Sequence, residues 1–406
     1  MTESTIGLLL GDCPSAPYLD LLRHARERDC LVFVPTAVLE ATPEIALLAD
    51  SMSIRLHAVG DDLTTVTRNH DLTALITFDE RYAYQALEAT VHLRRPDLPT
   101  PADKLDMRRL LNSRGMSHTK VWPLDGDSDL AAALAECSPI VVKPRRGVSS
   151  RDIAVVGDMA AWYSFAARHD IDLAHGKYFA EQFHDHIPFG DDADWYAAYV
   201  SVDVFMSPTG PEFLPADRAA PTANFGETGL LIPSRMSDEH RACLQDWAAR
   251  IGGIWDGHWP AFHIEFVHTA DGFQVVEVNP RLGGYLHVMS TASTPGADLV
   301  GAVFDICAGL PPHLPAPDTH AAYILVHPPG GAGKLVTPPD YRHLTRISPN
   351  IGVARRRKRD EGFDARHGTL NAICDLLVTA PDRRSLLSGI DAARQHILST
   401  ARFTQE

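Results

Sequence analysis

Short apolar runs alternate with amphipathic stretches over the first hundred residues. The runs predict β-strands, and the apolar positions between them recur at helical spacing, for example over residues 17–28 and 81–93. Alternating strands and helices favour a mostly parallel sheet with helices on its faces. No G-x-G-x-x-G follows the first strand, so nothing here supports a dinucleotide site. The predicted strands are Ile6 to Leu10, Leu31 to Val34, Ile54 to Val59 and Ala74 to Thr77.

Two proline-rich stretches mark the expected domain boundaries. Residues 95–101 read RPDLPTP and residues 309–317 read GLPPHLPAP, compositions typical of linkers. We therefore expect an N-terminal α/β domain over residues 1–100, a central domain over 101–312 and a C-terminal α+β domain over 313–406. Elements predicted beyond the first boundary include a helix from Ala102 to Arg114, strands at Ile140 to Lys143, Ile153 to Val156 and Ala321 to His327, and a final helix from Pro381 to Leu398.

Composition places the chain among ordinary globular proteins. Of its 406 residues, 45% are hydrophobic and 22% are charged. The net charge of −15 argues against a nucleic-acid binder, and residues 101–312 carry most of the excess, with 16 bases against 28 acids. The six cysteines show no CxxC spacing, so we expect reduced, mostly buried thiols in a cytoplasmic protein. No stretch approaches the roughly 18 apolar residues of a membrane span.

The most informative stretch is AFHIEFVHTADGFQVVEVNPRLGGY, residues 261–285. Two alternating segments flank the turn sequence TADG, which predicts a β-hairpin. Glu265 lies in its first strand, while Glu277 and Asn279 project from one face of the second. Carboxylate and amide oxygens suit Mg²⁺ that is shared with substrate phosphates. A solvent-facing strand would alternate in the same way, but the NPRLGG sequence that follows presents a fixed cation, Arg281, beside the proposed metal.

A second candidate is the loop after Lys143. The stretch IVVKPRRGVSSRDI, residues 140–153, predicts a strand that ends in this lysine, a loop with one glycine and two serines, and another strand. Backbone N–H groups of such a loop can bind phosphate, and the lysine adds a point charge. The Walker A pattern is absent. An ordinary β-hairpin accounts for the stretch equally well.

Two charged stretches have plainer interpretations. Residues 181–203 contain six acids and no lysine or arginine, as expected of a solvated loop. The histidines within it, His184 and His186, lack further ligands at metal-binding spacing, which argues against a metal site. The basic run over residues 355–359 is typical of a solvated edge, with contact to a polyanion as the alternative. The acids that we expect to be solvated are Asp185, Asp191 and Asp192.

Taken in order, these motifs resemble the ATP-grasp superfamily. Lys104 in PADKLDMRRLL, Lys143 before the Gly/Ser loop, the EQF triplet at 181–183 and the hairpin's EVNPR follow its arrangement, and the branch they resemble is that of the L-amino-acid ligases and related carboxylate–amine ligases. The resemblance covers nearly the whole chain and includes the FGETGLLIP segment. It implies a Rossmann-like pre-ATP-grasp domain, a central ATP-grasp domain with a lid subdomain at about residues 140–205, and a C-terminal segment that completes the grasp.

The resemblance also implies roles for individual residues. Arg281 and Lys143 would act in catalysis by neutralising charge on the transferring phosphoryl group. The implied substrate contacts are Arg218, Glu227, Arg281, Gly283, Gly284 and Tyr285. One or two Mg²⁺ ions, with Mn²⁺ as an alternative, would be held by Glu265, Glu277 and Asn279. The implied ATP contacts are Lys104, Lys143, the lid serines Ser149 and Ser150, the hinge residues Glu181, Gln182 and Phe183, and Asp194.

Two positions depart from the family pattern. Tyr199 stands where family members often have an acidic ribose contact, and Asp194 is the substitute that we consider. Leu230 follows the Glu-Thr-Gly triplet where several amino-acid ligases have histidine, so we expect a different amino-acid pocket. The sequence does not name the two substrates.

The activity that the resemblance implies is ATP-dependent ligation. A carboxylate, for example of an amino acid, would be activated as an acyl phosphate and coupled to an amine, such as a second amino acid, with release of ADP and phosphate. The alternatives are an ATP-grasp carboxylase or formyl-phosphate-using enzyme of nucleotide metabolism, and a non-catalytic ATP-binding regulator. We expect small-molecule substrates, no nucleic-acid or membrane partner and, as a family-level expectation, a homodimer.

Overall fold

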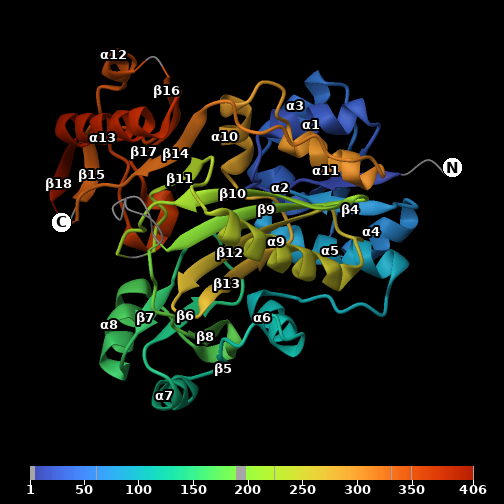
Figure 1. Cartoon of the computed structure of the whole chain (residues 1–406), viewed down its shortest axis with the longest axis horizontal. Helices are drawn as coiled ribbons and strands as arrows, with labels where there is room; N and C mark the ends of the chain where they lie inside the picture. Colours follow the sequence, from blue (N-terminus) through green and yellow to red (C-terminus); the bar gives the residue numbers. More distant parts are fainter. Residues whose placement is uncertain are drawn as a thin grey trace.

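The computed structural model describes residues 5–60, 62–188, 198–223, 225–330, 332–348 and 350–405. Its strands form one large sheet, two four-stranded sheets and a two-stranded ribbon. Figure 1 shows the large sheet in the middle, with the N-terminal sheet and the C-terminal elements at opposite ends and the second four-stranded sheet below. The chain is therefore a mixed α/β protein, as the sequence predicted.

The first hundred residues form a parallel sheet with the strand order β3-β2-β1-β4. Alternate residues of its central strands enter two different apolar clusters: Leu8 and Val32 belong to one, and Leu9 and Phe33 belong to the other. Both faces are thus buried, as is usual for parallel sheets covered by helices. All four predicted strands are present, with the bounds β1 Ile6–Leu9, β2 Leu31–Pro35, β3 Leu56–Val59 and β4 Ala74–Thr77. The helices are α1 Tyr18–Glu27, α2 Thr36–Ala41, α3 Glu44–Ser51, α4 Leu63–Asn69 and α5 Glu80–Arg94.

The second four-stranded sheet is antiparallel, with the order β5-β8-β6-β7. Its own small core is centred on Trp162 and Val142. The sheet spans residues 121–182, and the next strand along the chain, β9, pairs within the large sheet instead. Its strands are β5 Val121–Leu124, β6 Ile140–Pro144, β7 Ala154–Val156 and β8 Tyr178–Gln182. The helical segments are α6 Lys104–Ser113, α7 Asp127–Glu136, α8 Met159–His169 and η1 Ala174–Gly176.

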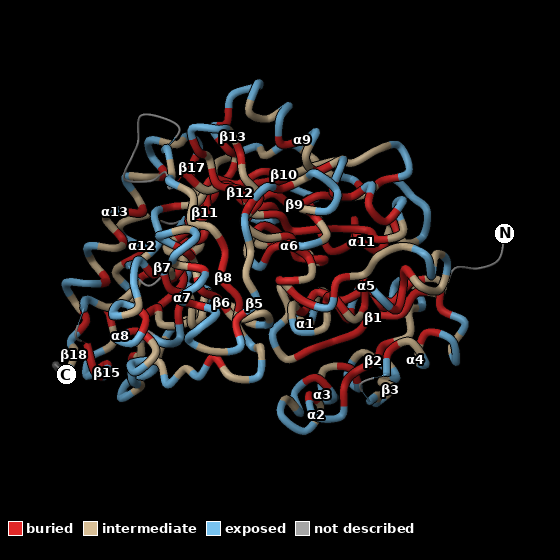
Figure 2. Tube along the Cα trace, turned by 90° about the horizontal axis from the view of Figure 1, so that it is seen from below, coloured by how far each residue is buried: buried red, intermediate tan, exposed pale blue. Residues whose placement is uncertain are grey.

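The large sheet has eight strands in the order β13-β12-β9-β10-β11-β14-β17-β16. The last three strands come from the C-terminal region, so this region extends the central sheet. One face packs into an apolar core that includes Val202, Phe262 and Ile264. Figure 2 shows β9 and β12, the strands that carry these residues, largely in the colour of buried residues. The strands are β9 Tyr199–Ser207, β10 Gly210–Arg218, β11 Gly229–Ile232, β12 Ala261–Thr269, β13 Gly272–Asn279, β14 His320–Val326, β16 Ile351–Arg356 and β17 Cys374–Ala380.

The remaining elements cover the large sheet and its C-terminal end. Strands β15 and β18 form the two-stranded ribbon. Helix α13 begins at Arg383 and ends at Thr400, two residues later at each end than the predicted helix. The other bounds are α9 Asp238–Gly252, η2 Gly253–Trp255, α10 Leu286–Ser293, α11 Leu299–Cys307, β15 Ala332–Thr337, η3 Tyr341–His343, α12 Leu344–Ile347, η4 Ala365–Asn371 and β18 Arg402–Gln405.

Two expectations about side chains need correction. The cysteines are free but not mostly buried: Cys374 is buried, Cys13 and Cys243 are exposed, and the other three are intermediate. The basic run is only partly a solvated edge. Arg355 forms two hydrogen bonds with the buried Asp375, because β16 pairs with β17 and brings the two side chains together.

The rest of the basic run divides in the same way. Arg357 donates to backbone carbonyl groups of Ala372 and Leu370, at 3.0 and 2.7 Å, while the neighbouring Arg356 is exposed. Among the described residues, no helix has the length and apolar character needed to cross a bilayer.

Candidate active site

A β-hairpin carries the acidic residues of the site. Strands β12 and β13 pair antiparallel, with Glu265 opposite Glu277 and His263 opposite Asn279. Residues that lie directly opposite each other share a face, so both carboxylates and the amide project to one side. Asn279 Oδ1 is buried and has no hydrogen-bond partner among the described residues. The hairpin thus presents three oxygen-bearing side chains together, as its sequence predicted.

The same face of the sheet continues across the neighbouring strands. Asp203 on β9 lies opposite His263, so both side chains point to this side. Farther along, Arg218 on β10 lies opposite Leu230, which in turn lies opposite Tyr323 on β14. This face of the sheet therefore carries the charged residues of the site beside apolar residues, such as Leu230 and Tyr323, that belong to a buried core.

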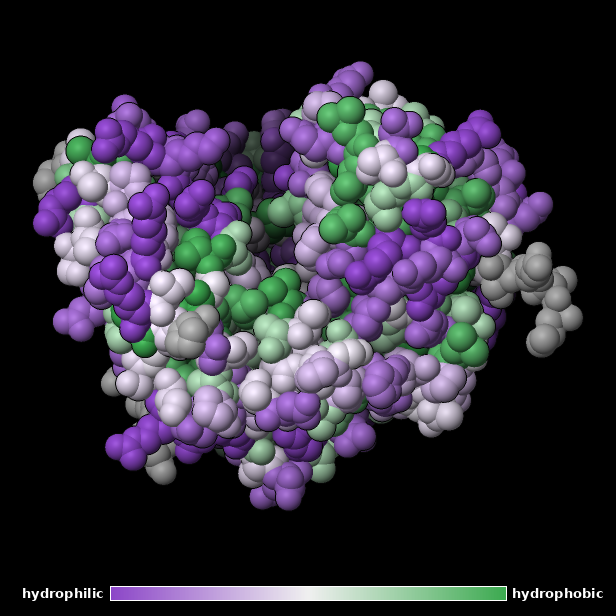
Figure 3. All heavy atoms as spheres, turned by 90° about the horizontal axis from the view of Figure 1, so that it is seen from above, coloured by the Kyte–Doolittle hydropathy of each residue, from purple (hydrophilic) through white to green (hydrophobic). Residues whose placement is uncertain are grey.

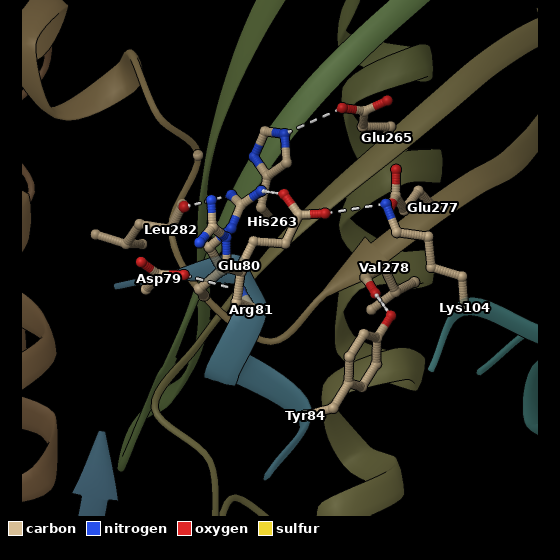
Figure 4. Close-up of polar contacts among 12 residues, drawn as sticks. Asp79, Glu80, Arg81, Tyr84, Lys104, His263, Glu265, Glu277, Val278 and Leu282 are labelled. Atoms are coloured by element: carbon tan, nitrogen blue, oxygen red, sulfur yellow. Dashed lines mark hydrogen bonds and ion pairs between the residues drawn. The ribbon is translucent and has the colours of Figure 1, made fainter. Parts of the chain in front are cut away.

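Eight charged side chains on and above this face form what we call the hairpin cluster. Lys104 bridges Glu80, at 2.9 Å, and Glu277. Figure 4 shows this lysine reaching toward both carboxylates from the side opposite His263. Arg218 bridges Glu227 and Glu265, the latter at 2.7 Å. The members of the cluster are Glu80, Lys104, Arg218, Glu227, His263, Glu265, Glu277 and Arg281.

His263 is the buried hub between two carboxylates. Its Nδ1 lies 2.8 Å from Asp203 Oδ1, and its Nε2 lies 3.5 Å from Glu265 Oε1. Burial opposes the charged imidazolium, but the hydrogen bonds to both carboxylates outweigh it and raise the pKa of His263 to about 9. A charged His263 holds the Glu265 carboxylate in place through this contact. Asp203 also accepts a hydrogen bond from the backbone N–H of Gly283, at 2.9 Å.

Helix caps place two members of the hairpin cluster. Asp79 caps α5 by accepting from the Arg81 N–H at 2.9 Å, so Glu80 is the first residue of that helix and lies at the carboxyl edge of the parallel sheet. Asp103 caps α6 in the same way and makes Lys104 its first residue. The first residues of these two helices meet above the hairpin, where Lys104 Nζ donates to Glu80 Oε1 at 2.9 Å.

A second group of charges, which we call the Glu181 cluster, lies beside the hairpin. Arg108 Nε and Lys143 Nζ each approach one oxygen of Glu181, at 2.7 Å. The three side chains are only 4%, 9% and 7% exposed, respectively. Burial raises the pKa of a carboxyl group, but the two cations outweigh it and lower the pKa of Glu181 to about 2.

A β-bulge joins the two clusters. The pairing of β12 and β13 shifts between Glu265 and Phe266, which leaves Val276 without a direct cross-strand partner. The Val276 carbonyl oxygen instead accepts from Arg108 Nη2, at 2.8 Å, and from Lys143 Nζ, at 3.5 Å. The irregularity therefore anchors the Glu181 cluster to the hairpin.

One cavity of about 360 Å³ runs between these groups. The recess is visible between the two lobes of the surface in Figure 3. The N-terminal domain contributes Cys13, Ser15 and Glu80 to its wall, so all three regions of the chain line it. At one end the wall is apolar and includes Leu230 and Tyr285, whose ring stacks on Tyr323 with centroids 4.3 Å apart, together with Phe225, Leu286 and Leu370.

The structure brings the predicted site residues to this cavity. Asp194 lies outside the described residues. The following line the cavity: Lys104, Lys143, Ser149, Ser150, Glu181, Gln182, Phe183, Arg218, Glu227, Glu265, Glu277, Asn279, Arg281, Gly283, Gly284 and Tyr285. Tyr199 and Leu230, the two positions that depart from the family pattern, line it as well, and the Tyr199 hydroxyl lies 3.3 Å from His186 Nε2.

Sequence reasoning missed three members of the two clusters, Glu80, Arg108 and His263, and also Asp203, the partner of His263. Glu80 could have been found, because it follows a buried parallel strand at the edge where such sheets bind ligands. Asp203 was counted with the acids of residues 181–203, yet it is fully buried. Nothing in the local sequence marks Arg108 or His263, since their partners, Glu181 and Asp203, lie 73 and 60 residues away.

The donor set of the hairpin fits Mg²⁺. Two carboxylates and an amide oxygen without a partner are the hard oxygen ligands that this ion takes. Among the described residues, no three His, Cys, Asp or Glu side chains converge as a ready-made metal site. Mg²⁺ usually keeps several waters and shares its coordination with substrate phosphates, so it needs only a few protein oxygens.

Comparison with known proteins shows the fold. No family model matches the chain. An L-amino acid ligase from Bacillus licheniformis superposes with a TM-score of 0.67 and 16% identity over 100% of both chains. A carboxyaminoimidazole ribonucleotide synthase from Aspergillus clavatus, solved in complex with ATP, gives a TM-score of 0.68 and 15% identity over 98% of this chain and 99% of that chain.

A sequence match to a curated protein covers a smaller region. Carnosine synthase 1 from Mus musculus is 32% identical over 124 residues, which are 30% of this chain and 14% of the mouse protein. The chain thus matches a small part of the length of this relative. The full-length superpositions show the ATP-grasp fold, and they confirm the predicted resemblance to L-amino-acid ligases.

Proposed function

We propose that the protein is an ATP-dependent carboxylate–amine ligase. It would activate an amino acid or a similar small carboxylate as an acyl phosphate and couple it to an amine, giving an amide or dipeptide, ADP and phosphate. The observation that carries the proposal is the hairpin: Glu265 opposite Glu277, with Asn279 beside them, in one cavity with three separate cations. Those cations are Lys104, Lys143 and Arg281.

The charges of the cavity suit phosphoryl transfer. Catalysis of this reaction consists mostly of positioning and of neutralising charge on the phosphates. Glu265, Glu277 and Asn279 would hold Mg²⁺, which supplies Lewis-acid neutralisation of phosphate charge when bound. Lys104 and Lys143 both reach β13, at Glu277 and at the Val276 carbonyl oxygen respectively, where each would contact phosphate oxygens.

Arg281 would hold the carboxylate that receives the phosphoryl group and neutralise charge on the transferring group. Its guanidinium is fixed by Glu80 and by the Leu282 carbonyl oxygen, at 2.6 Å, so it is positioned before any substrate binds. A fixed guanidinium costs little reorganisation when charge develops beside it. Gly283 lets the backbone pack against His263, because a Cβ there would lie 2.5 Å from His263 Nδ1. A Cβ at Gly284 would meet nothing within 4 Å, so a substrate would have room to approach the backbone there.

The names of two comparison proteins agree with this reaction type. One is an L-amino acid ligase, a name that describes ligation of amino acids, and the other is a carnosine synthase. The apolar end of the cavity, with Tyr285 and Leu230 in its wall, supports a substrate that carries a side chain. Fold likeness alone would fit a carboxylase of nucleotide metabolism equally well.

The test is a matrix of amino-acid pairs incubated with the full chain, ATP and Mg²⁺. We expect ADP and phosphate to appear when a carboxylate and an amine are both present, and the amide to be found by mass spectrometry in equal amount. Release of AMP and pyrophosphate would contradict an acyl phosphate. ADP release that depends on bicarbonate or formate would favour the carboxylase or formyl-phosphate reaction, and ATP binding without turnover would favour a regulator.

A further inference from the structure

The tip of the Ser149–Ser150 loop is bound to the C-terminal region. The Thr369 backbone N–H donates to the Ser149 carbonyl oxygen at 2.9 Å. Thr369 belongs to η4, more than two hundred residues later in the chain, and its side chain is 1% exposed. The loop that we assign to the phosphates is therefore closed against η4 by a direct contact.

The contact is too close for any residue except glycine at position 368. A Cβ atom placed there would lie 2.3 Å from the Ser149 carbonyl oxygen and 2.9 Å from that of Ser150. Gly368 also has a φ of +54°, in a region that side chains disfavour. Ser149 and Ser150 both have positive φ as well, at 60° and 55°, so the loop tip holds an uncommon backbone conformation where it meets η4.

The same threonine also binds the substrate side of the cavity. Its hydroxyl oxygen accepts from the Glu227 backbone N–H at 3.1 Å. His327 Nε2 donates to the Glu227 carbonyl oxygen at 2.7 Å, so both backbone groups of this residue are held by the C-terminal region. Glu227 in turn pairs with Arg218, the neighbour of Glu265. Thr369 thus contacts both the lid loop, at Ser149, and the hairpin cluster, at Glu227.

Two arginines of the basic run, residues 355–359, donate hydrogen bonds to η4. Arg357 Nη2 donates to the Leu370 carbonyl oxygen at 2.7 Å, and the side chain of Leu370 lines the cavity next to the loop serines. Arg355, held by Asp375, adds a longer contact of 3.5 Å to the same carbonyl oxygen. The arginines that the sequence alone would place on a solvated edge instead fix η4 in position.

We propose that Gly368 and Thr369 are positioning residues that clasp the phosphate loop shut while setting Glu227. The proposal rests on the proposed ligase function. An acyl phosphate that meets water instead of the amine is hydrolysed: water adds to the carbonyl carbon, the C–O bond to phosphate breaks, and the free carboxylate and inorganic phosphate are regenerated. Each such turnover consumes one ATP and forms no amide, and a closed loop prevents it by excluding water.

The first measurement is the ratio of phosphate released to amide formed. In the wild type we expect a ratio near one. Gly368→Ala pushes the loop away and should raise the ratio several-fold, because ATP is still used but the intermediate is lost to water. Gly362→Ala is the matched control, since a Cβ there would approach nothing closer than 3.8 Å. An unchanged ratio in a folded Gly368→Ala protein would overturn the proposal.

A second pair of variants keeps the test informative if Gly368→Ala fails to fold. Thr369→Val removes the acceptor of the Glu227 N–H but leaves the backbone contact to Ser149. We expect a smaller rise in the ratio, restored to the wild-type value in Thr369→Ser. If Thr369→Ser and Thr369→Val behave alike, the hydroxyl does not set Glu227.

A structural readout separates this proposal from the proposed function. Arg146 and Arg151 flank the loop tip and offer trypsin two cleavage sites. We expect Gly368→Ala to be cut there faster than wild type and Gly362→Ala, because opening of the loop exposes its backbone. Equal cleavage rates would contradict the clasp. Absence of carboxylate- and amine-dependent ADP release in the wild type would refute the ligase function instead, whatever the cleavage rates.

Discussion

The two charge clusters of the cavity differ in how far their carboxylates are exposed and in whether a polar atom without a partner lies beside them. In the Glu181 cluster, one buried carboxylate receives two cations, and both of those cations also reach the Val276 carbonyl oxygen. In the hairpin cluster, Glu265 and Glu277 are each 19% exposed, and Asn279 Oδ1 has no partner among the described residues. The first arrangement is what a structural ion pair needs, and the second can accept a further cation.

The difference predicts that stability and activity will depend on different carboxylates. Removing the charge of Glu181 leaves two buried cations unmatched, which is costly. Removing the charge of Glu277 leaves Lys104 with Glu80, so folding loses little. Four predictions test this contrast.

The largest effect is expected on activity. Glu277→Gln should lower turnover by roughly 10³-fold, about 4 kcal/mol of transition-state stabilisation, because a ligand of the proposed Mg²⁺ loses its charge. Phosphate release under saturating substrates measures it. Glu88→Gln, on the exposed surface of α5, is the control. Near-normal turnover in Glu277→Gln would remove the hairpin from the site.

The next effect is on stability. Glu181→Gln should lower the free energy of unfolding by about 3 kcal/mol, because Arg108 and Lys143 become a buried pair of like charges without a counterion. Urea unfolding of Glu181→Gln and Glu277→Gln, each against the wild type, measures the two free-energy changes. Glu136→Gln, which breaks an exposed pair with Lys120, should cost much less. The contrast fails if Glu181→Gln and Glu277→Gln destabilise the protein equally.

Lowering the pH should remove part of the contribution of Glu181 to the free energy of unfolding. Burial is outweighed by two cations, so the folded-state pKa of Glu181 is about 2, below its ordinary value of 4.5. A depressed pKa gives stability that is present above 4.5 and lost as the pH falls through 2. The difference in unfolding free energy between wild type and Glu181→Gln should therefore shrink by about 2 kcal/mol from pH 5 to pH 3. A difference independent of pH would mean that Glu181 is not charged in the folded protein.

The smallest effect concerns the support of the metal ligands. His263 contacts Glu265, a proposed metal ligand. Mutation of a residue that supports a metal ligand in this way typically lowers metal affinity about 10- to 100-fold. His263→Gln should raise the Mg²⁺ concentration for half-maximal activity about tenfold, with a smaller change at saturating Mg²⁺. Asp203→Asn, which removes the other partner of His263, should act in the same direction. A lowered activity with unchanged Mg²⁺ dependence would make His263 a purely structural residue.

The hairpin was predictable in outline because the information for its strands and its turn is local. Local alternation predicted the two strands and the turn, but continuing the register of that turn would set Glu265 opposite Val276. The β-bulge between Glu265 and Phe266 shifts the pairing by one residue and thereby sets Glu265 opposite Glu277. Lys104 and Lys143 were predictable for a related reason, since an N-cap aspartate and the end of an apolar strand mark their places in the chain. The domain bounds and the individual roles of these residues stay predictions.

The partners of these residues were not predictable. Asp203 looks like one more acid in an acidic stretch, but pairing of β9 with β12 buries it against His263. The arginines of the basic run look solvated, but pairing of β16 with β17 turns Arg355 onto Asp375. In each case a side chain that looks solvated in the sequence is paired in the structure, because a strand distant in the chain lies next to its own strand.

By itself, then, the sequence determined the elements and which side chains share a face, because both follow from the period of each element and the residues that cap it. Only the tertiary structure decided which charges are paired and which remain available. That outcome depends on contacts such as the one between Asp203 and His263, whose residues are 60 positions apart in the chain and carry no local signal of each other. Burial then gives these contacts their weight, because a charge removed from water must find its counterion within the fold.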